Sequence, residues 1–147
     1  MRHSFRYAAV VFALVSALGA CGSSSYKGLT KAEFIRRANE NCAHPSKAGK
    51  TVRKLIAVET VPARKATLYL DRVLPLFDRE IDRIAALKPP KADRDRVEKI
   101  LEQARADAKK FTAYLKDDPA VAFSPALRPF KKSGDLAMAY GLRICID

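Results

Sequence analysis

Histidine and cysteine, on which most metal binding and nucleophilic catalysis depend, are scarce: the chain has two histidines and three cysteines among 147 residues. No H-E-x-x-H, C-x-x-C or C-x-x-C-H motif is present, so zincin, thioredoxin-like and c-type haem sites have no support. A di-iron bundle requires paired Glu-x-x-His motifs, and the residue three before His44 is Asn41. Glycine-rich phosphate loops and the G-x-S-x-G elbow are also absent. The sequence therefore predicts no metal, no cofactor and no catalytic residue.

Strand patterns and long apolar runs are missing as well. No segment shows the strict apolar and polar alternation of a half-buried strand, and there is no Asn-Gly or Asp-Gly hairpin signal. The apolar run from Tyr7 to Leu18 is shorter than the roughly 20 residues of a membrane-spanning helix. These absences favour an all-α fold, and they indicate that the apolar run is not a permanent anchor.

The apolar run has the form of a signal peptide. Met1 to Arg6 is a cationic head, and small residues follow the apolar segment and lead to Cys21. Leu18-Gly19-Ala20-Cys21 resembles the bacterial lipobox, in which the cysteine sulfur is diacylated and the chain is cut just before it. We therefore expect residues 1–20 to be removed, Cys21 to carry the lipid, and the mature protein to be extracytoplasmic and anchored to the cell membrane.

The mature chain divides into a short Gly/Ser-rich tether, residues 21–28, and one helical domain, residues 29–147. Removing Arg2 and Arg6 with the signal leaves about +10 of the formal charge of +12. Outside the cytoplasm, the anionic partners are lipid headgroups, wall polymers and acidic proteins, and nucleic acid is not expected. The alternative, which we favour, is a solvated surface whose charge confers solubility.

Two cysteines remain once Cys21 is assigned to lipid. Cys42 and Cys145 form an even pair in an exported chain, where such pairs are most often structural disulfides. We therefore predict a Cys42–Cys145 bond. The alternative makes Cys42 a nucleophile beside His44, but Cys42 falls on the apolar face of the first expected helix, which favours the disulfide.

Helical periodicity predicts an antiparallel bundle of about four helices. The first begins at a capping box formed by Thr30 and Glu33, with Leu29 and Phe34 at the hydrophobic-staple positions. Its pattern passes Pro45 and continues to about residue 58, either as one kinked helix, which we slightly favour, or as a second helix from about residue 46. The other helices are expected over about 63–87, with a bend at Pro75, about 92–116, and from Ser124-Pro125 to about 144.

A basic cluster falls within the segment after Pro45. Its members lie largely on one side of a helical wheel: Lys47, Lys50, Arg53 and Lys54. Each basic residue near an anionic membrane surface contributes about 1 kcal/mol of attraction, so this side is a candidate contact for an anionic surface. The alternative, which we favour, is the polar face of a helix opposite Val52, Leu55 and Ile56.

Three carboxylates of one expected helix do not form an acid/base pair in our interpretation. Asp78, Glu80 and Asp82 have Arg79 and Arg83 as neighbours, and such mixed charge is typical of a helix surface. General acid/base catalysis also needs a second group across a cleft, and nothing in the sequence places one there. We therefore predict that the protein is not an enzyme.

Two segments carry a resemblance to known proteins. Leu-Thr-Lys-Ala-Glu-Phe-Ile-Arg-Arg-Ala-Asn-Glu-Asn-Cys, residues 29–42, and Tyr-Gly-Leu-Arg-Ile-Cys, residues 140–145, resemble a group of small actinobacterial lipoproteins and secreted helical proteins of unknown function. The resemblance spans essentially the mature domain. It implies the same disulfide and offers no catalytic residue. Pro45, soon after the first cysteine, is a departure from the group.

The sequence thus favours a lipoprotein that binds a partner at the cell envelope without catalysis. The membrane is its first partner, through the lipid anchor, and an envelope protein or anionic polymer is the second. The alternative function is a structural envelope component whose basic surface holds anionic wall polymer or lipid.

The disulfide is the first testable prediction. Mass mapping of the mature protein without reduction should recover the Cys42 and Cys145 peptides joined. In the chain-entropy model, a closed loop of this length stabilises the fold by up to about 4.7 kcal/mol, so reduction should lower the free energy of unfolding. Recovery of two free thiols would contradict the prediction.

Overall fold

The computed structural model describes residues 28–43 and 47–142. Within these ranges the chain is helical and contains no strand, which confirms the all-α prediction. The helices are α1 (Lys31–Ala43), α2 (Lys47–Val58), α3 (Pro62–Leu68), the π-helical η1 (Tyr69–Val73), α4 (Leu74–Ala85), the 3-10 segment η2 (Lys91–Asp93), α5 (Arg94–Asp117), α6 (Pro119–Ala122) and α7 (Lys131–Tyr140). The prediction of about four helices was too low. When α3, η1 and α4 are counted as one continuous helix, the described chain has about six.

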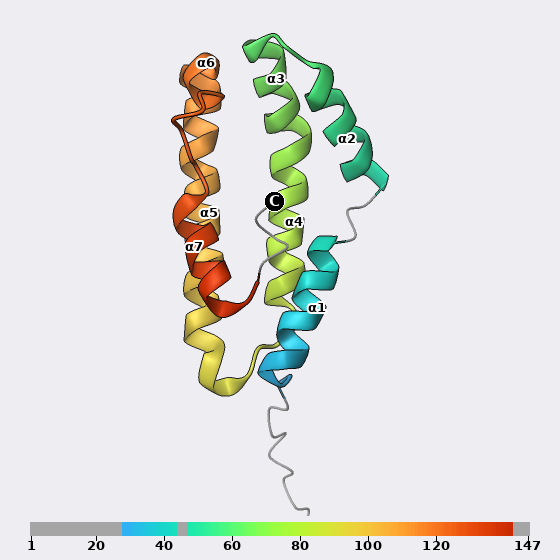
Figure 1. The fold of residues 1–147 in the computed structure, drawn as a ribbon, viewed down its shortest axis with the longest axis vertical. Coiled ribbons are helices and arrows are strands. Elements are labelled where there is room, and N and C mark those ends of the chain that lie inside the picture. Colours follow the sequence, from blue (N-terminus) through green and yellow to red (C-terminus); the bar gives the residue numbers. More distant parts are fainter. Residues whose placement is uncertain (1–27, 44–46, 143–147) are drawn as a thin grey trace, which may run out of the picture.

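Two long columns form the body of the fold (Figure 1). One is α5, and the other is the continuous run of α3, η1 and α4. α7 packs along α5, α1 packs against α4, and α6 joins the ends of α3 and α5. α2 lies at the outer side of the second column, where it contacts α3 and η1.

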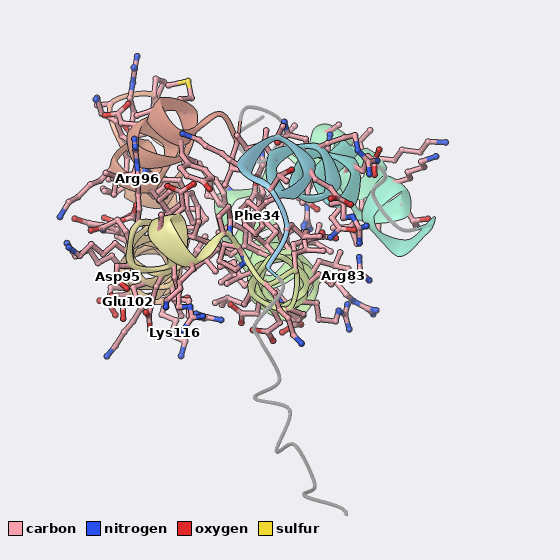
Figure 2. The ribbon with its side chains drawn as sticks, turned by 90° about the horizontal axis from the view of Figure 1, so that it is seen from below. Phe34, Arg83, Asp95, Arg96, Glu102 and Lys116 are labelled. Atoms are coloured by element: carbon pink, nitrogen blue, oxygen red, sulfur yellow. The ribbon has the colours of Figure 1, made fainter. Side chains whose placement is uncertain are left out.

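The core consists of two apolar clusters. The first joins four helices and Leu142, which follows α7: Phe34, Ala38, Ile81, Ile84, Val97, Ile100, Leu101, Ala137, Tyr140 and Leu142. The second lies at the other end of α5: Ala66, Phe111, Leu115 and Ala122. Figure 2 shows Phe34 between the helices, whereas Arg83, Glu102 and Lys116 project outward. Both clusters lie within residues 34–142, so we expect a chain that begins at residue 21 to fold.

The start of α1 follows the predicted local signals. The Glu33 backbone N–H donates to Thr30 Oγ1 at 3.3 Å, which is the cap expected of that threonine. The Glu33 carboxylate pairs with Arg37 one turn later and not with the Thr30 backbone N–H, so the Thr30 half of the predicted capping box is the half that the described residues form. Leu29 and Phe34 pack in the same cluster, as a hydrophobic staple requires.

The segment around Pro45 was predicted to hold either a kink or the start of a second helix. Residues 44–46, where these alternatives differ, lie outside the described residues. On either side of them, α1 ends at Ala43 and α2 begins at Lys47, and the two helices point in different directions (Figure 1). Proline lacks a backbone N–H and disfavours the α conformation at the residue before it, which agrees with a change of direction here.

Pro75 changes the helix that contains it in a specific way. The helix continues from Pro62 to Ala85, but Tyr69–Val73 forms a π-helical turn just before the proline. A proline inside a helix removes one hydrogen bond and clashes with the carbonyl of the preceding turn, and a wider turn relieves such a conflict. The prediction was a bend at Pro75, and what the structure shows is a π-helical segment directly before the proline.

The last helix is shorter than predicted. Pro119–Ala122 forms the short α6, capped by Asp118, whose carboxylate accepts the N–H groups of Ala120 and Val121. The Ser124-Pro125 segment is a turn, and α7 begins only at Lys131. α7 ends at Tyr140 because Gly141 takes a left-handed conformation, with φ of 108°. The glycine that was expected inside the helix is its C-terminal cap.

Gly141 gives a test of this packing. At its positive φ any other residue is strained, and a Cβ there would lie 3.1 Å from Ile35 Cδ1. We expect Gly141→Ala to lower the free energy of unfolding by about 1–3 kcal/mol, measured by urea denaturation. Met138→Ala, at an exposed position of the same helix, is the control and should change it by less than about 0.5 kcal/mol. Equal effects of the two substitutions would contradict the assignment.

Candidate functional site

An apolar pocket of about 530 Å³ lies between α2 and the helices α4, α5 and α7. Its volume falls within the roughly 300–1,000 Å³ range of small-molecule sites. The apolar part of its lining comes from five elements: Val52, Ile56, Ala57, Tyr69, Val73, Leu74, Leu76, Phe77, Ile81, Ile84, Ile100, Leu101, Ala104, Phe111, Phe130, Ala137 and Leu142. Five further residues complete the lining: Gly49, Arg53, Glu80, Ser133 and Gly134.

Helical periodicity explains why these residues meet. Phe77, Ile81 and Ile84 follow the spacing that brings side chains to one side of α4. Val52 and Ile56 do the same on α2. The pocket therefore forms where the stripe of α2 approaches the body of the bundle without joining either core cluster.

Three aromatic residues give the pocket a rigid apolar wall. The Tyr69 and Phe111 rings meet edge to face with centroids 5.6 Å apart, and Phe111 contacts Phe130 in the same way at 5.8 Å. Burial raises the pKa of the Tyr69 phenol, so this residue adds an uncharged hydroxyl to the lining. Such aromatic pairs hold large rings in fixed orientations.

Glu80 is the acidic residue of the lining. Its Oε1 accepts a hydrogen bond from Arg83 at 3.1 Å, while its Oε2 is buried and has no partner among the described residues. A buried hydrogen-bond acceptor that has no donor destabilises the folded protein. Sequence reasoning took Glu80 for ordinary surface charge, because the neighbouring arginines hid its position on the inner edge of α4.

A buried carboxylate fixes the wall formed by α7. Asp107 is 4% exposed, and its Oδ2 accepts the Ser133 backbone N–H at 3.0 Å. Its Oδ1 accepts from the Gln103 amide at 2.7 Å. The Ser133 hydroxyl donates to the Phe130 carbonyl at 3.2 Å. These bonds join α5 to the first turn of α7. One sequence signal could have identified Asp107 as a buried carboxylate. It directly precedes Ala108, which belongs to the apolar stripe of α5.

The basic cluster divides in the structure. Lys50, Arg53 and Lys54 are exposed on α2, and only Arg53 also lines the pocket. Lys47 begins α2, but its side chain lies outside the described residues. Sequence reasoning assigned this side of the helix to solvent or an anionic surface and did not foresee that the opposite side borders a pocket. Val52 and Ile56 lie on that opposite side, but the prediction was wrong for Leu55, which is 47% exposed and does not line the pocket.

The predicted lipid and disulfide sites lie largely outside the described residues. Cys21 and Cys145 fall outside them, and Cys42 belongs to α1 by its backbone while its side chain is not described. Lipidation and the disulfide therefore stay predictions. Among the residues that the structure describes, no group of three metal-ligating side chains comes together.

Comparison with known proteins finds no protein-family model, curated protein or solved structure that matches this chain. The resemblance to small actinobacterial lipoproteins stays a prediction. Over residues 28–43 and 47–142, no helix has the length and hydropathy needed to cross a membrane. The function is therefore argued from the pocket and the surfaces around it.

Proposed function

We propose that this protein is a lipid-anchored binding module, outside the cytoplasm and without catalytic activity, that holds an apolar ligand between α2 and the bundle. The observation that carries the proposal is the pocket of about 530 Å³. Small-molecule sites have this size and combine a mainly apolar lining with a few polar groups. An acyl chain or another elongated apolar molecule has the matching chemistry.

The apolar lining supplies the driving force for such binding. Water in a pocket of this kind finds few hydrogen-bond partners, and apolar cavities in proteins accept apolar guests. Displacing that water and burying the ligand gains about 25 cal/mol for each Å² of apolar surface removed from solvent. The polar groups Arg53, Glu80 and Ser133 then orient one end of the ligand.

The side chains of the pocket support binding rather than catalysis. The Ser133 hydroxyl donates to a backbone carbonyl and not to a general base. The Glu80 carboxylate is paired through one oxygen with Arg83. Within the part of the chain that the structure describes, neither residue has a neighbour that would activate it as a nucleophile or as a proton-transfer group.

Filling the pocket tests the proposal. Ala104 lines it and Ala113 is exposed on the same helix. We expect a fluorescent fatty-acid analogue to bind the chain that begins at residue 21 and carries Cys21→Ser. Because a phenyl ring occupies the space of the ligand, Ala104→Phe should weaken binding at least about tenfold. Ala113→Phe should bind as the unchanged protein does.

Two results would overturn the ligand proposal: failure of the unchanged protein to bind while its circular dichroism shows an intact helical fold, or equal affinity of the two phenylalanine variants. Mass spectrometry of the protein purified from membranes gives a second measurement. It should detect an apolar compound that Ala104→Phe loses and Ala113→Phe retains.

The lipid anchor has its own test. In a bacterial host the full chain should be found in the membrane fraction with a diacylglycerol mass at Cys21, and globomycin, which blocks lipoprotein signal cleavage, should stop its processing. Cys21→Ser should remove this lipid, and with it the hydrocarbon that anchors the chain. Lipid anchoring would be contradicted if Cys21 of the full chain carried no lipid, or if Cys21→Ser stayed in the membrane fraction as the unchanged chain does.

A further inference from the structure

We infer that the outer face of α2, formed by Lys50, Lys54, Leu55 and Val58, is a docking surface for a bilayer that contains anionic lipid. This face is separate from the pocket, which Val52 and Ile56 line from the other side of the same helix. The inference therefore does not depend on the pocket ligand.

Uncompensated positive charge is the first observation. α2 contains no acidic residue, and Lys50, Arg53 and Lys54 form no ion pair with any residue that the structure describes. By contrast, α1 pairs Arg36 with Glu40, and α7 pairs a lysine with an aspartate at the same spacing.

The arrangement of these cations favours an anionic partner. Lys50 and Lys54 stand one helical turn apart, where like charges destabilise a helix. An anionic surface removes this repulsion, since it supplies the counter-charge that the described residues of the domain do not.

Exposed apolar side chains on the same face are the second observation. Val58 is 77% exposed and Leu55 is 47% exposed, although both are large and hydrophobic. Val58 follows Lys54 by one turn, and Leu55 follows Lys54 directly. A helix that joins basic and apolar side chains in this way lies in the plane of a membrane interface, with its apolar groups among the acyl chains.

These apolar residues distinguish a bilayer from a wall polymer. A polyanion of sugars and phosphates satisfies the two lysines but offers no hydrocarbon to Leu55 and Val58. A bilayer supplies both anionic headgroups and hydrocarbon, so it is the partner that uses the whole face.

The packing of α2 leaves this face open. Its one buried residue among the described side chains is Val52, at 8% exposure, and Val52 belongs to neither core cluster. The helix contacts the second column through α3 and η1 (Figure 1). Its outer side is therefore available to a flat surface.

The experiment is flotation of the chain that begins at residue 21 and carries Cys21→Ser, with vesicles of phosphatidylcholine alone or mixed with phosphatidylglycerol. We expect binding to the mixed vesicles only. Lys50→Gln with Lys54→Gln should weaken it about 30-fold, which is about fivefold for each lysine. Lys99→Gln with Lys110→Gln, exposed on α5, removes the same charge and should change binding less than twofold.

The apolar part is tested at constant charge. Leu55→Ser with Val58→Ser should weaken binding to the mixed vesicles at least about tenfold. Leu136→Ser with Met138→Ser, exposed on α7, is the matched control and should leave it unchanged. The chain contains no tryptophan, so Val58→Trp adds a single reporter, and its emission should shift to the blue on mixed vesicles alone.

Each other outcome overturns the inference. If the serine pair on α2 binds as the unchanged protein does, or the tryptophan emission does not shift, the contact is with charge alone. If a soluble poly(glycerol phosphate) binds more tightly than the mixed vesicles, the face serves a polymer. If both lysine pairs weaken binding equally, the site is not on α2. Ala104→Phe should leave vesicle binding unchanged, which separates this inference from the proposed pocket function.

Discussion

The whole domain depends on the apolar stripe of one long helix. α5 contributes Val97, Ile100 and Leu101 to the first core cluster and Phe111 and Leu115 to the second. α4 and α7 pack against its first half, and α3 and α6 against its second. Because one rigid rod serves both clusters, the two ends of the molecule keep a fixed relation to each other. The pocket lies along the same rod and inherits that geometry.

α2 differs from every other long helix of the described chain in what it contributes. It adds no residue to either core cluster, yet its inner side lines the pocket and its outer side carries the unpaired lysines. The residues around it hold it at its C-terminal end, where the Val61 N–H donates to Glu59 and Arg64 pairs with the same carboxylate. The Val61 hydrogen bond is the main cause that lowers the pKa of Glu59. A helix that adds no residue to either core cluster is one that a bundle can present to a partner.

Local signals and regular periodicity were the predictable part of this fold. The Thr30 cap, the staple of Leu29 and Phe34, and the stripe of α5 are each decided within a few turns of chain, so the sequence pattern sufficed. The change of direction around Pro45 and the shortened last helix depended on competition between a tolerable helix pattern and tertiary packing, which periodicity does not measure.

The pocket was beyond sequence reasoning for a different reason. Val52 and Ile56 have the same spacing as core residues whether they meet a packed surface or a hollow one. Glu80 resembled the solvated charges beside it, and Asp107 was hidden within an apolar stripe. Only the position of each helix relative to its neighbours shows which side chains share a space.

The Asp107–Ser133 bond has a consequence for the shape of the pocket. It ties the first turn of α7 to α5, so the wall that Ser133, Gly134 and Ala137 form is held in one position. Breaking a hydrogen bond to a buried carboxylate is costly. A ligand of the proposed kind must therefore match the contour of this wall, because the wall cannot move aside cheaply.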